Sequence, residues 1–283
     1  MEIKKVGVVG CGSMGAGIAQ LCAQSGYQVV VSEINDEFLK RGMRSIDKVL
    51  SRSVEKGKLS QADKDAVMGR LKGTTSTKDF ADCDLVIEAA IENLDLKKKI
   101  FAELDGICPK QAILATNTSC LSIIDMAVVT KRPEKVLGLH FFNPAPVMKL
   151  LEIVKTITTS DETIAASQKF GQSLGKTTVI AQDAPGFIVN RLWIPFLLHT
   201  IRLYEDGVAS REDIDNAISL GLNYPMGPLT LSDMVGVDVV KFVSDALYEQ
   251  LKDPRYITPT LVDKMVAAGW LGRKTGKGFY DYK

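Results

Sequence analysis

The stretch IKKVGVVGCGSMGAGIAQLCA, residues 3–23, decides how the chain begins to fold. Its first part, Ile3 to Val9, is rich in β-branched side chains, as in a short buried strand. Apolar residues from Met14 to Cys22 then recur at the spacing of one helix face. A G-x-G-x-x-G motif over residues 10–15 joins the two segments, and a dinucleotide-binding loop requires this order of strand, glycines and helix.

The glycines of this loop have separate tasks. Gly10 permits the tight turn, Gly12 lets a pyrophosphate approach the backbone, and Gly15 lets the helix pack close to the strand. The start of the helix offers free N–H groups and the positive end of its dipole to the phosphates. Glu33 ends the next strand-like run, where a carboxylate can bind ribose hydroxyls and repel a 2′-phosphate, so NAD(H) is favoured over NADP(H). The cofactor residues predicted in this loop are Gly10, Cys11, Gly12, Ser13, Met14 and Gly15.

Strand-like and helix-like segments alternate through the first part of the chain. The strand-like runs after the first are residues 29–31, 85–87 and 112–115, and the main helical patterns are 38–54 and 96–104. This alternation predicts a mostly parallel sheet with right-handed crossovers. The pattern breaks at Asp183-Ala184-Pro185-Gly186 and becomes helical beyond it. We therefore expect an α/β domain over residues 1–183 and an all-helical domain over residues 184–283.

Composition excludes several classes of protein. Thirty-five basic residues against 34 acidic ones give a net charge of +1, which excludes a strongly basic nucleic-acid-binding protein. Neither a signal peptide nor a sufficiently long apolar span is present, which predicts a cytoplasmic protein that does not bind membranes. Five cysteines without a C-x-x-C pair make a disulfide scaffold or a zinc site unexpected, and no metal is predicted.

A catalytic pair is suggested by one of the two histidines. His199 lies in an apolar helix and is interpreted as a packed or partly exposed side chain and not as a ligand. His140 lies in a strand-like run, 136–142, and a second such run follows at 150–154. If the two runs pair antiparallel about Pro146, His140 stands opposite Glu152. A carboxylate on an imidazole fixes its tautomer and raises its basicity, as a general base requires, although a lone histidine in a strand is more often structural.

Two further polar residues are candidates for substrate contact. Ser119 follows the strand-like run 112–115, and ligands of open α/β sheets gather at the carboxyl ends of strands. A serine–threonine turn or a helix cap explains Ser119 equally well on local grounds. Asn190 lies in the otherwise apolar start of a helix, and it either satisfies a structural hydrogen bond or faces a cleft between domains. Cys120 is disfavoured as a nucleophile because nothing else indicates acyl transfer.

Together these motifs resemble the 3-hydroxyacyl-CoA dehydrogenase family, and within it the short bacterial 3-hydroxybutyryl-CoA dehydrogenases. The resemblance covers essentially the whole chain, and its histidine motif and APGFIVNR are more discriminating than the glycine loop. The motifs are GCGSMGAGIA, DLVIEAAIEN, LATNTSCLSI, GLHFFNPAPVMKLLEIV, APGFIVNR, PMGPLTLSD and GWLGRKTGKGFYDY.

The resemblance implies a Rossmann-like N-terminal domain, whose mostly parallel sheet carries added antiparallel strands, and a helical C-terminal domain that mediates dimerisation. It implies reversible hydride transfer between NAD(H) and C3 of a (3S)-3-hydroxyacyl-CoA, with acetoacetyl-CoA and 3-hydroxybutyryl-CoA as the expected pair. His140 matches the catalytic base and Glu152 its paired acid, while Ser119 and Asn190 match the residues that hold the reacting end of the substrate. The other matching positions are Glu33, Glu92, Lys97, Asn143 and Lys274 around the cofactor, and Arg52 and Lys56 facing the CoA phosphates.

Departures from the family pattern and competing functions complete the expectations. Cys11 and Cys120 stand where relatives commonly carry Ala and Ser, and they are expected to add oxidant sensitivity beside the cofactor. Glu33 stands where relatives often carry Asp, and Arg52 where some carry Lys. The alternatives are a dehydrogenase of broader chain length, a sugar-acid dehydrogenase of the same fold, and a non-catalytic structural protein such as a lens crystallin.

Overall fold

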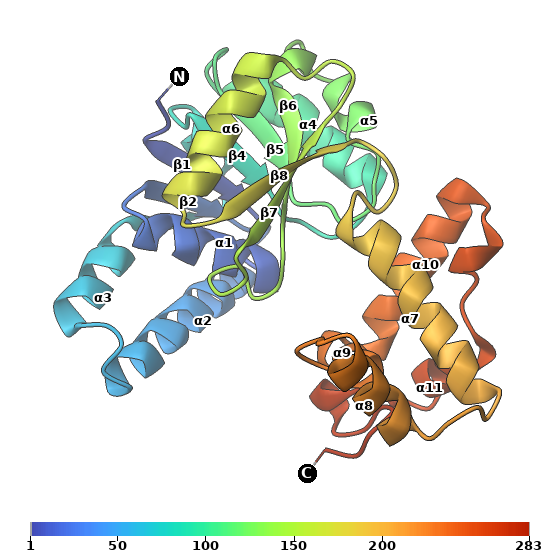
Figure 1. The fold of residues 1–283 in the computed structure, drawn as a ribbon. Helices are drawn as coiled ribbons and strands as arrows, with labels where there is room; N and C mark the ends of the chain where they lie inside the picture. The colour runs from blue at the N-terminus through green and yellow to red at the C-terminus, as the bar shows by residue number, and fades with distance from the viewer. Residues whose placement is uncertain (1, 283) are drawn as a thin grey trace. The chain divides into compact units, whose positions relative to one another are not determined.

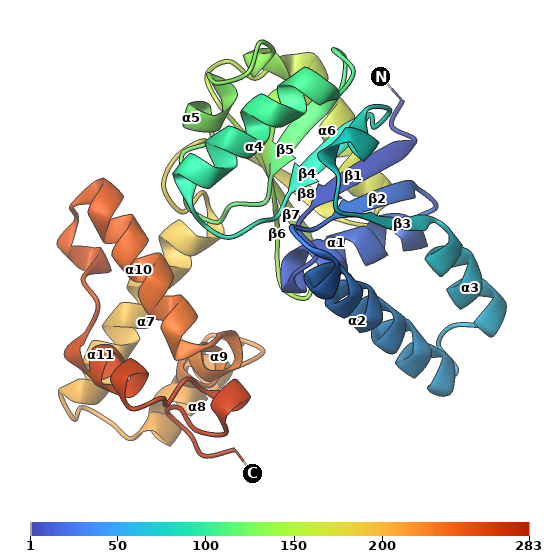
Figure 2. The ribbon, with the colours of Figure 1, turned by 180° about the vertical axis from the view of Figure 1, so that it is seen from behind.

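The computed structural model of the protein describes residues 2–282, which form two compact units. The boundary between the units lies between Ala184 and Pro185. The first unit is built on a sheet and the second on helices, as the colours of Figure 1 and the reverse view in Figure 2 show.

The first unit contains one eight-stranded sheet with the order β3-β2-β1-β4-β5-β6-β7-β8. Every neighbouring pair is parallel except β6 and β7, which are antiparallel. The expected mostly parallel sheet with an antiparallel addition is therefore confirmed. The strands are β1 Lys5–Val9, β2 Gln28–Ser32, β3 Leu71–Thr74, β4 Leu85–Glu88, β5 Ile113–Thr116, β6 Val136–Phe141, β7 Leu150–Lys155 and β8 Thr177–Gln182.

Helices cover both faces of this sheet. Helix α6 crosses one face and α4 the other, as the two opposite views show. Four of the helix starts are capped by side chains, and in two of them Asn35 accepts a hydrogen bond from the backbone of Phe38 and Ser60 from that of Asp63. The helices of this unit are α1 Ser13–Gln24, α2 Asp36–Glu55, α3 Gln61–Gly69, α4 Leu94–Ile107, α5 Ile124–Ala127 and α6 Asp161–Ser173, with short 3₁₀ turns at Thr77–Phe80 and Pro133–Lys135.

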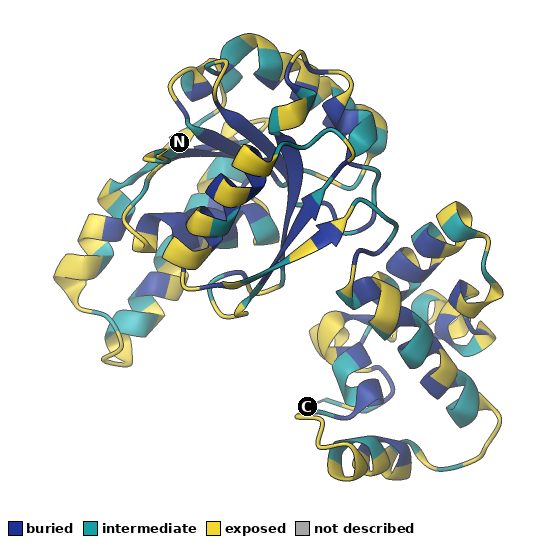
Figure 3. Cartoon of the chain, turned by 45° about the horizontal axis from the view of Figure 1, so that its top comes forward, coloured by how far each residue is buried: buried dark blue, intermediate teal, exposed yellow. Residues whose placement is uncertain are grey.

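The central strands are buried along almost their whole length, as the dark blue of the sheet in Figure 3 shows. Parallel strands covered on both faces read as continuous apolar runs, which is why Leu85-Val86-Ile87 could be recognised in the sequence. The outer strands β3 and β8 were not predicted. Their residues are mostly half-buried or exposed, so they lack such a run.

The second unit is helical, as expected, apart from isolated bridges formed by Lys277 with Gly272 and with Asp281. Ser210 caps α8 by accepting from the backbone of Asp213, which confirms the predicted start. The Asp233 carboxylate accepts the backbone N–H groups of Phe279 and Tyr280 at 2.9 Å and so fastens the end of the chain to α9. The helices are α7 Val189–Glu205, α8 Arg211–Gly221, α9 Pro228–Val235, α10 Val237–Leu251 and α11 Thr260–Ala267, with 3₁₀ turns at Pro254–Tyr256 and Arg273–Thr275.

Helix α7 is the apolar helix that contains His199. One of its faces is buried through Ile194, Leu197, Leu198 and Ile201, while Pro195 lies inside it and His199 is exposed. Within residues 2–282, no helix combines the length and the apolar character that a membrane crossing needs.

Candidate active site

A buried imidazole–carboxylate pair lies on the antiparallel strands. His140 of β6 stands directly opposite Glu152 of β7, which confirms the register predicted from the sequence. Nδ1 of His140 is 2.6 Å from Oε2 of Glu152, and both side chains are almost wholly buried. The loop between the strands is held by Lys176, whose Nζ donates to the carbonyls of Ala145 and Met148 at 2.6 Å each.

This pair has the arrangement of a general base and the group that orients it. An ionised carboxylate can only accept a hydrogen bond, so the proton lies on Nδ1 of His140 and Nε2 is the nitrogen suited to proton exchange. The ring of Phe142 packs against the imidazole, with the ring centroids 4.6 Å apart. Packing and hydrogen bonding therefore restrict the orientation of the ring.

The glycine loop between β1 and α1 has the shape that a pyrophosphate needs. Gly10 has a positive φ of 95°, and a Cβ there would lie 2.7 Å from the carbonyl oxygen of Ala89. A Cβ on Gly15 would lie 2.0 Å from the carbonyl oxygen of Gly10. Gly12, the N-cap of α1, differs, because a Cβ there would meet no protein atom within 4 Å. Open space in front of a helix N-terminus fits an anionic dinucleotide.

Glu33 lies against this loop, directly after β2. Its carboxylate accepts the backbone N–H groups of Cys11 and Ile34, each at 2.9 Å. The acid predicted from the sequence is thus fixed at the carboxyl end of β2 and touches the glycine loop. These residues fit the binding of NAD(H).

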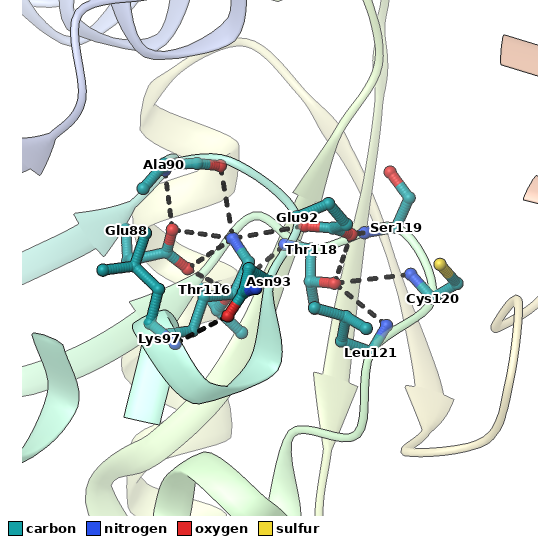
Figure 4. Close-up of polar contacts among 11 residues, drawn as sticks. Glu88, Ala90, Glu92, Asn93, Lys97, Thr116, Thr118, Ser119, Cys120 and Leu121 are labelled. Atoms are coloured by element: carbon teal, nitrogen blue, oxygen red, sulfur yellow. Dashed lines mark hydrogen bonds and ion pairs between the residues drawn. The ribbon is translucent and has the colours of Figure 1, made fainter. Parts of the chain in front are cut away.

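A buried polar network joins the loops that follow β4 and β5 (Figure 4). Lys97 of α4 is 1% exposed, and its ammonium lies 2.7 Å from Oε1 of Glu88 and 3.2 Å from Oε2 of Glu92. Thr116 donates its hydroxyl to Glu88 at 2.7 Å. The family resemblance predicts Lys97 near the cofactor. In the structure its ammonium contacts the carboxylates of Glu88 and Glu92, so an effect of Lys97 on a cofactor would act through these two side chains.

Ser119 lies in a turn that this network supports. The backbone N–H of Ser119 and the hydroxyl of Thr118 both donate to Oε1 of Glu92, at 2.8 and 2.5 Å. Thr118 also accepts the backbone N–H of Leu121 at 3.0 Å. The hydroxyl of Thr118 thus supports the turn next to Ser119. The hydroxyl of Ser119 points away from Glu92 (Figure 4).

The expected oxidant sensitivity of two cysteines is not supported by their surroundings. Burial, with a smaller effect of Glu33, raises the pKa of Cys11 to about 11. Burial likewise raises the pKa of Cys120 to about 12. Because the thiolate is the reactive form, both groups are protected thiols at neutral pH.

Comparison with known proteins identifies the family of the chain. A sequence profile described as the NAD binding domain of 3-hydroxyacyl-CoA dehydrogenase matches residues 5–184, and that of the C-terminal domain matches residues 186–282. The chain belongs to the 3-hydroxyacyl-CoA dehydrogenase family. A 3-hydroxybutyryl-CoA dehydrogenase of Mycobacterium tuberculosis is 46% identical over 282 residues, 99% of each chain.

A solved structure and a second sequence relative agree with this assignment to the family. The (S)-3-hydroxybutyryl-CoA dehydrogenase of Ralstonia eutropha is 45% identical, with a TM-score of 0.94 and full coverage of both chains. A relative named 3-hydroxybutyryl-CoA dehydrogenase in Clostridioides difficile is 44% identical over 278 residues, 98% of this chain and 99% of the relative. The N-terminal unit of this dehydrogenase-family chain is thus an NAD-binding unit.

The remaining residues that the family resemblance suggested lie in three places. Asn143 is exposed two residues after the end of β6, and Arg52 and Lys56 are exposed at the end of α2. Asn190 is 9% exposed in the first turn of α7. Lys274, in the same helical unit, makes an ion pair with Asp238 at 2.5 Å.

Sequence reasoning missed three members of the buried polar network, Glu88, Thr116 and Thr118. The sequence contained a signal for Glu88, because it is an acidic residue at the end of an apolar strand. Glu33 has a similar position, directly after an apolar strand. Its meaning depended on its partners, Lys97 and Thr116, and Thr116 lies 28 residues further along the chain.

Proposed function

We propose that this chain catalyses reversible hydride transfer between NAD(H) and C3 of a (3S)-3-hydroxyacyl-CoA, with 3-hydroxybutyryl-CoA and acetoacetyl-CoA as the substrate pair. The observation that carries the proposal is the buried His140–Glu152 pair at 2.6 Å, in a unit whose glycine loop fits a dinucleotide. The names of relatives that match along the whole chain support the C4 substrate.

His140 is the acid–base group of this reaction. In oxidation, Nε2 accepts the proton of the 3-hydroxyl group, and the Glu152 carboxylate stabilises the imidazolium that forms. In reduction, the protonated imidazole gives this proton to the 3-keto oxygen. When bound, NAD(H) accepts or supplies the hydride at C3. Acid–base assistance of this kind contributes about 10²–10⁴-fold, and positioning supplies the rest.

Other side chains bind and orient. Ser119 and Asn190 hydrogen-bond the oxygens of the substrate's reacting end. Arg52 and Lys56 are four residues apart at the end of α2 and so lie on the same side of the helix. In this proposal they bind the CoA phosphates. Changing both to Ala is expected to raise the KM for acetoacetyl-CoA by about tenfold while the Kd for NADH stays unchanged.

The glycine loop binds the cofactor in this proposal. Contacts of the cofactor with Glu92, Asn143 and Lys274 remain predictions. Glu33 selects NAD(H), because its carboxylate accepts ribose hydroxyls and repels a 2′-phosphate. Glu33→Ser is expected to weaken the binding of NADH. It is also expected to lower the ratio of NADH turnover to NADPH turnover by about tenfold or more. An unchanged ratio of NADH to NADPH turnover would contradict this selection.

The helical unit mediates homodimerisation. Leu192 of α7, Leu220 of α8 and Phe242 of α10 expose 70%, 83% and 49% of their surface. We infer that these side chains contribute to the surface that binds a second copy of the chain, because a contiguous exposed apolar patch is typical of an interaction surface. Sedimentation equilibrium is expected to give twice the mass of the chain, and Leu220→Glu combined with Phe242→Glu to give the monomer.

The deciding experiment measures NADH consumption with acetoacetyl-CoA, with longer 3-ketoacyl-CoAs and with NADPH in place of NADH. The expected result is fast turnover with acetoacetyl-CoA and NADH that falls with chain length, and loss of most turnover in a folded His140→Gln variant. Equal rates at all lengths would replace the C4 substrate by a broad one. Lack of turnover with any CoA ester, in protein that binds NADH, would overturn the proposal.

A further inference from the structure

Glu88 is a wholly buried carboxylate that the proposed reaction does not use. It ends β4, next to β1 and β5 in the sheet, so it lies between the glycine loop and the Ser119 turn. Ala89, the next residue, abuts the glycine loop, since a Cβ on Gly10 would lie 2.7 Å from its carbonyl oxygen. Burial of a charged side chain costs several kcal/mol of desolvation free energy, so the contacts of a buried carboxylate must offset this cost.

Among the described residues, the hydrogen-bond partners of this carboxylate lie in the loop after β4, at the end of β5 and in α4. Oε1 of Glu88 accepts the backbone N–H of Ala90 at 2.6 Å, and Oε2 accepts the hydroxyl of Thr116 at 2.7 Å. Lys97 donates to both oxygens, at 2.7 and 2.9 Å. The contacts therefore fix the Ala90 loop, the end of β5 and the first part of α4 to one point (Figure 4).

The charges of the network make Glu88 compete with Glu92 for one ammonium. Lys97 is closer to Glu88, at 2.7 Å, than to Glu92, at 3.2 Å. Glu92 thereby keeps Oε1 for Thr118 and for the backbone N–H of Ser119. If Glu88 lost its charge, Lys97 would be left with one carboxylate, and Glu92 would be drawn from the turn toward the ammonium.

We propose that Glu88 is a positioning residue that takes the nearer contact of Lys97, leaves Oε1 of Glu92 to Thr118 and Ser119, and so fixes the turn that presents Ser119. It acts through Lys97 and Glu92 and does not touch the substrate. This inference rests on the proposed function for the role of Ser119, whereas the order it imposes on the turn can be measured without any substrate.

The test is Glu88→Gln, which keeps the size of the side chain and removes its charge. The kcat with acetoacetyl-CoA is expected to fall about 10–100-fold, while the Kd for NADH from fluorescence titration changes less than about threefold. Hydrogen–deuterium exchange of the segment 117–121 is expected to rise about tenfold, because the backbone N–H of Ser119 loses its fixed acceptor.

Rescue distinguishes positioning from a general loss of packing. Lys97→Met alone leaves Glu88 and Glu92 as unpaired carboxylates and is expected to be worse than Glu88→Gln. Combining the two changes removes the competing ammonium and frees Glu92 for the turn. The double variant is therefore expected to recover about tenfold in kcat over Lys97→Met and to restore the slow exchange of the segment 117–121.

A matched control exists at the other end of the same strands. Asp105 makes a buried ion pair with Arg132 at 2.7 Å, with side chains 9% and 8% exposed, on segments that precede β5 and β6. Asp105→Asn is expected to lower stability by a similar amount without changing kcat, the Kd for NADH or exchange at 117–121. If Glu88→Gln fails to fold, Thr116→Val removes one donor to Glu88 and is expected to lower kcat about threefold.

The outcomes separate this inference from the proposed function. Absence of wild-type turnover would overturn the function, while slow exchange that depends on Glu88 would still support the positioning. A Glu88→Gln variant with wild-type kcat and exchange, or with losses no larger than those of Asp105→Asn, would overturn the positioning.

Discussion

Replacing Glu152 by Gln isolates the contribution of charge to the candidate catalytic pair. The amide has the size of the carboxylate, and its oxygen can still accept the Nδ1–H of His140 across the observed 2.6 Å contact. The imidazole therefore keeps its tautomer and orientation. What the variant loses is the negative charge that stabilises the imidazolium formed when His140 takes the substrate proton.

The size of this loss follows from the geometry. With the two charge centres about 4 Å apart and an effective dielectric constant of about 20, the attraction is about 4 kcal/mol. The hydrogen bond that the amide retains offsets about 1 kcal/mol of this. The remaining loss of about 3 kcal/mol corresponds to a decrease of about 10²-fold in the rate of the proton-transfer step.

The assay is steady-state NADH oxidation with acetoacetyl-CoA, with NADH binding followed separately by fluorescence. We expect kcat to fall about 10²-fold and the Kd for NADH to stay within about twofold of the wild type, since Glu152 does not lie on the glycine loop. Circular dichroism checks that the variant is folded. A folded variant whose kcat lies within about fivefold of the wild type would refute the electrostatic role of Glu152.

Three further results are expected. Gly12→Ala should raise the Kd for NADH by about tenfold or more without lowering the melting temperature, because its Cβ would meet no protein atom within 4 Å and can only obstruct a ligand. Iodoacetamide at neutral pH should leave activity intact, because burial raises the pKa of Cys120 to about 12; rapid inactivation traced to Cys120 by peptide mapping would contradict this. Lys176→Met should lower the free energy of unfolding in urea by about 2–4 kcal/mol, since the carbonyls of Ala145 and Met148 lose a buried donor.

The parts of the fold that the sequence predicts are those encoded by neighbouring residues. The glycine loop lies between a strand and the helix that follows it, and the caps at Ser60 and Ser210 act within one turn. The His140–Glu152 register could also be predicted, because a hairpin links the two strands and fixes which residues face each other.

The Glu88 network could not be predicted in this way, for a physical reason. Its members come from β4, α4 and the loop after β5, and Thr116 is 28 residues from Glu88. Parallel strands are joined by long crossovers, so no turn sets their register, and only packing of the whole sheet brings Thr116 to Glu88 and the Ser119 turn to Glu92. A residue of this kind appears in the sequence only as a charged side chain at the end of an apolar strand.

The antiparallel direction of β7 explains why the His140–Glu152 pair lies at the same edge of the sheet as the glycine loop and the Ser119 turn. Strands β1, β2, β4, β5 and β6 all run to that edge, where the glycine loop, Glu33, Glu88 and Ser119 follow their ends. A further parallel strand would enter the sheet from the opposite edge. Because β7 instead turns back at the site, Glu152 lies near its beginning and His140 near the end of β6, so the pair is held rigidly by the sheet. The loops at the same edge can then adapt to a cofactor while the proton-transfer pair keeps its geometry.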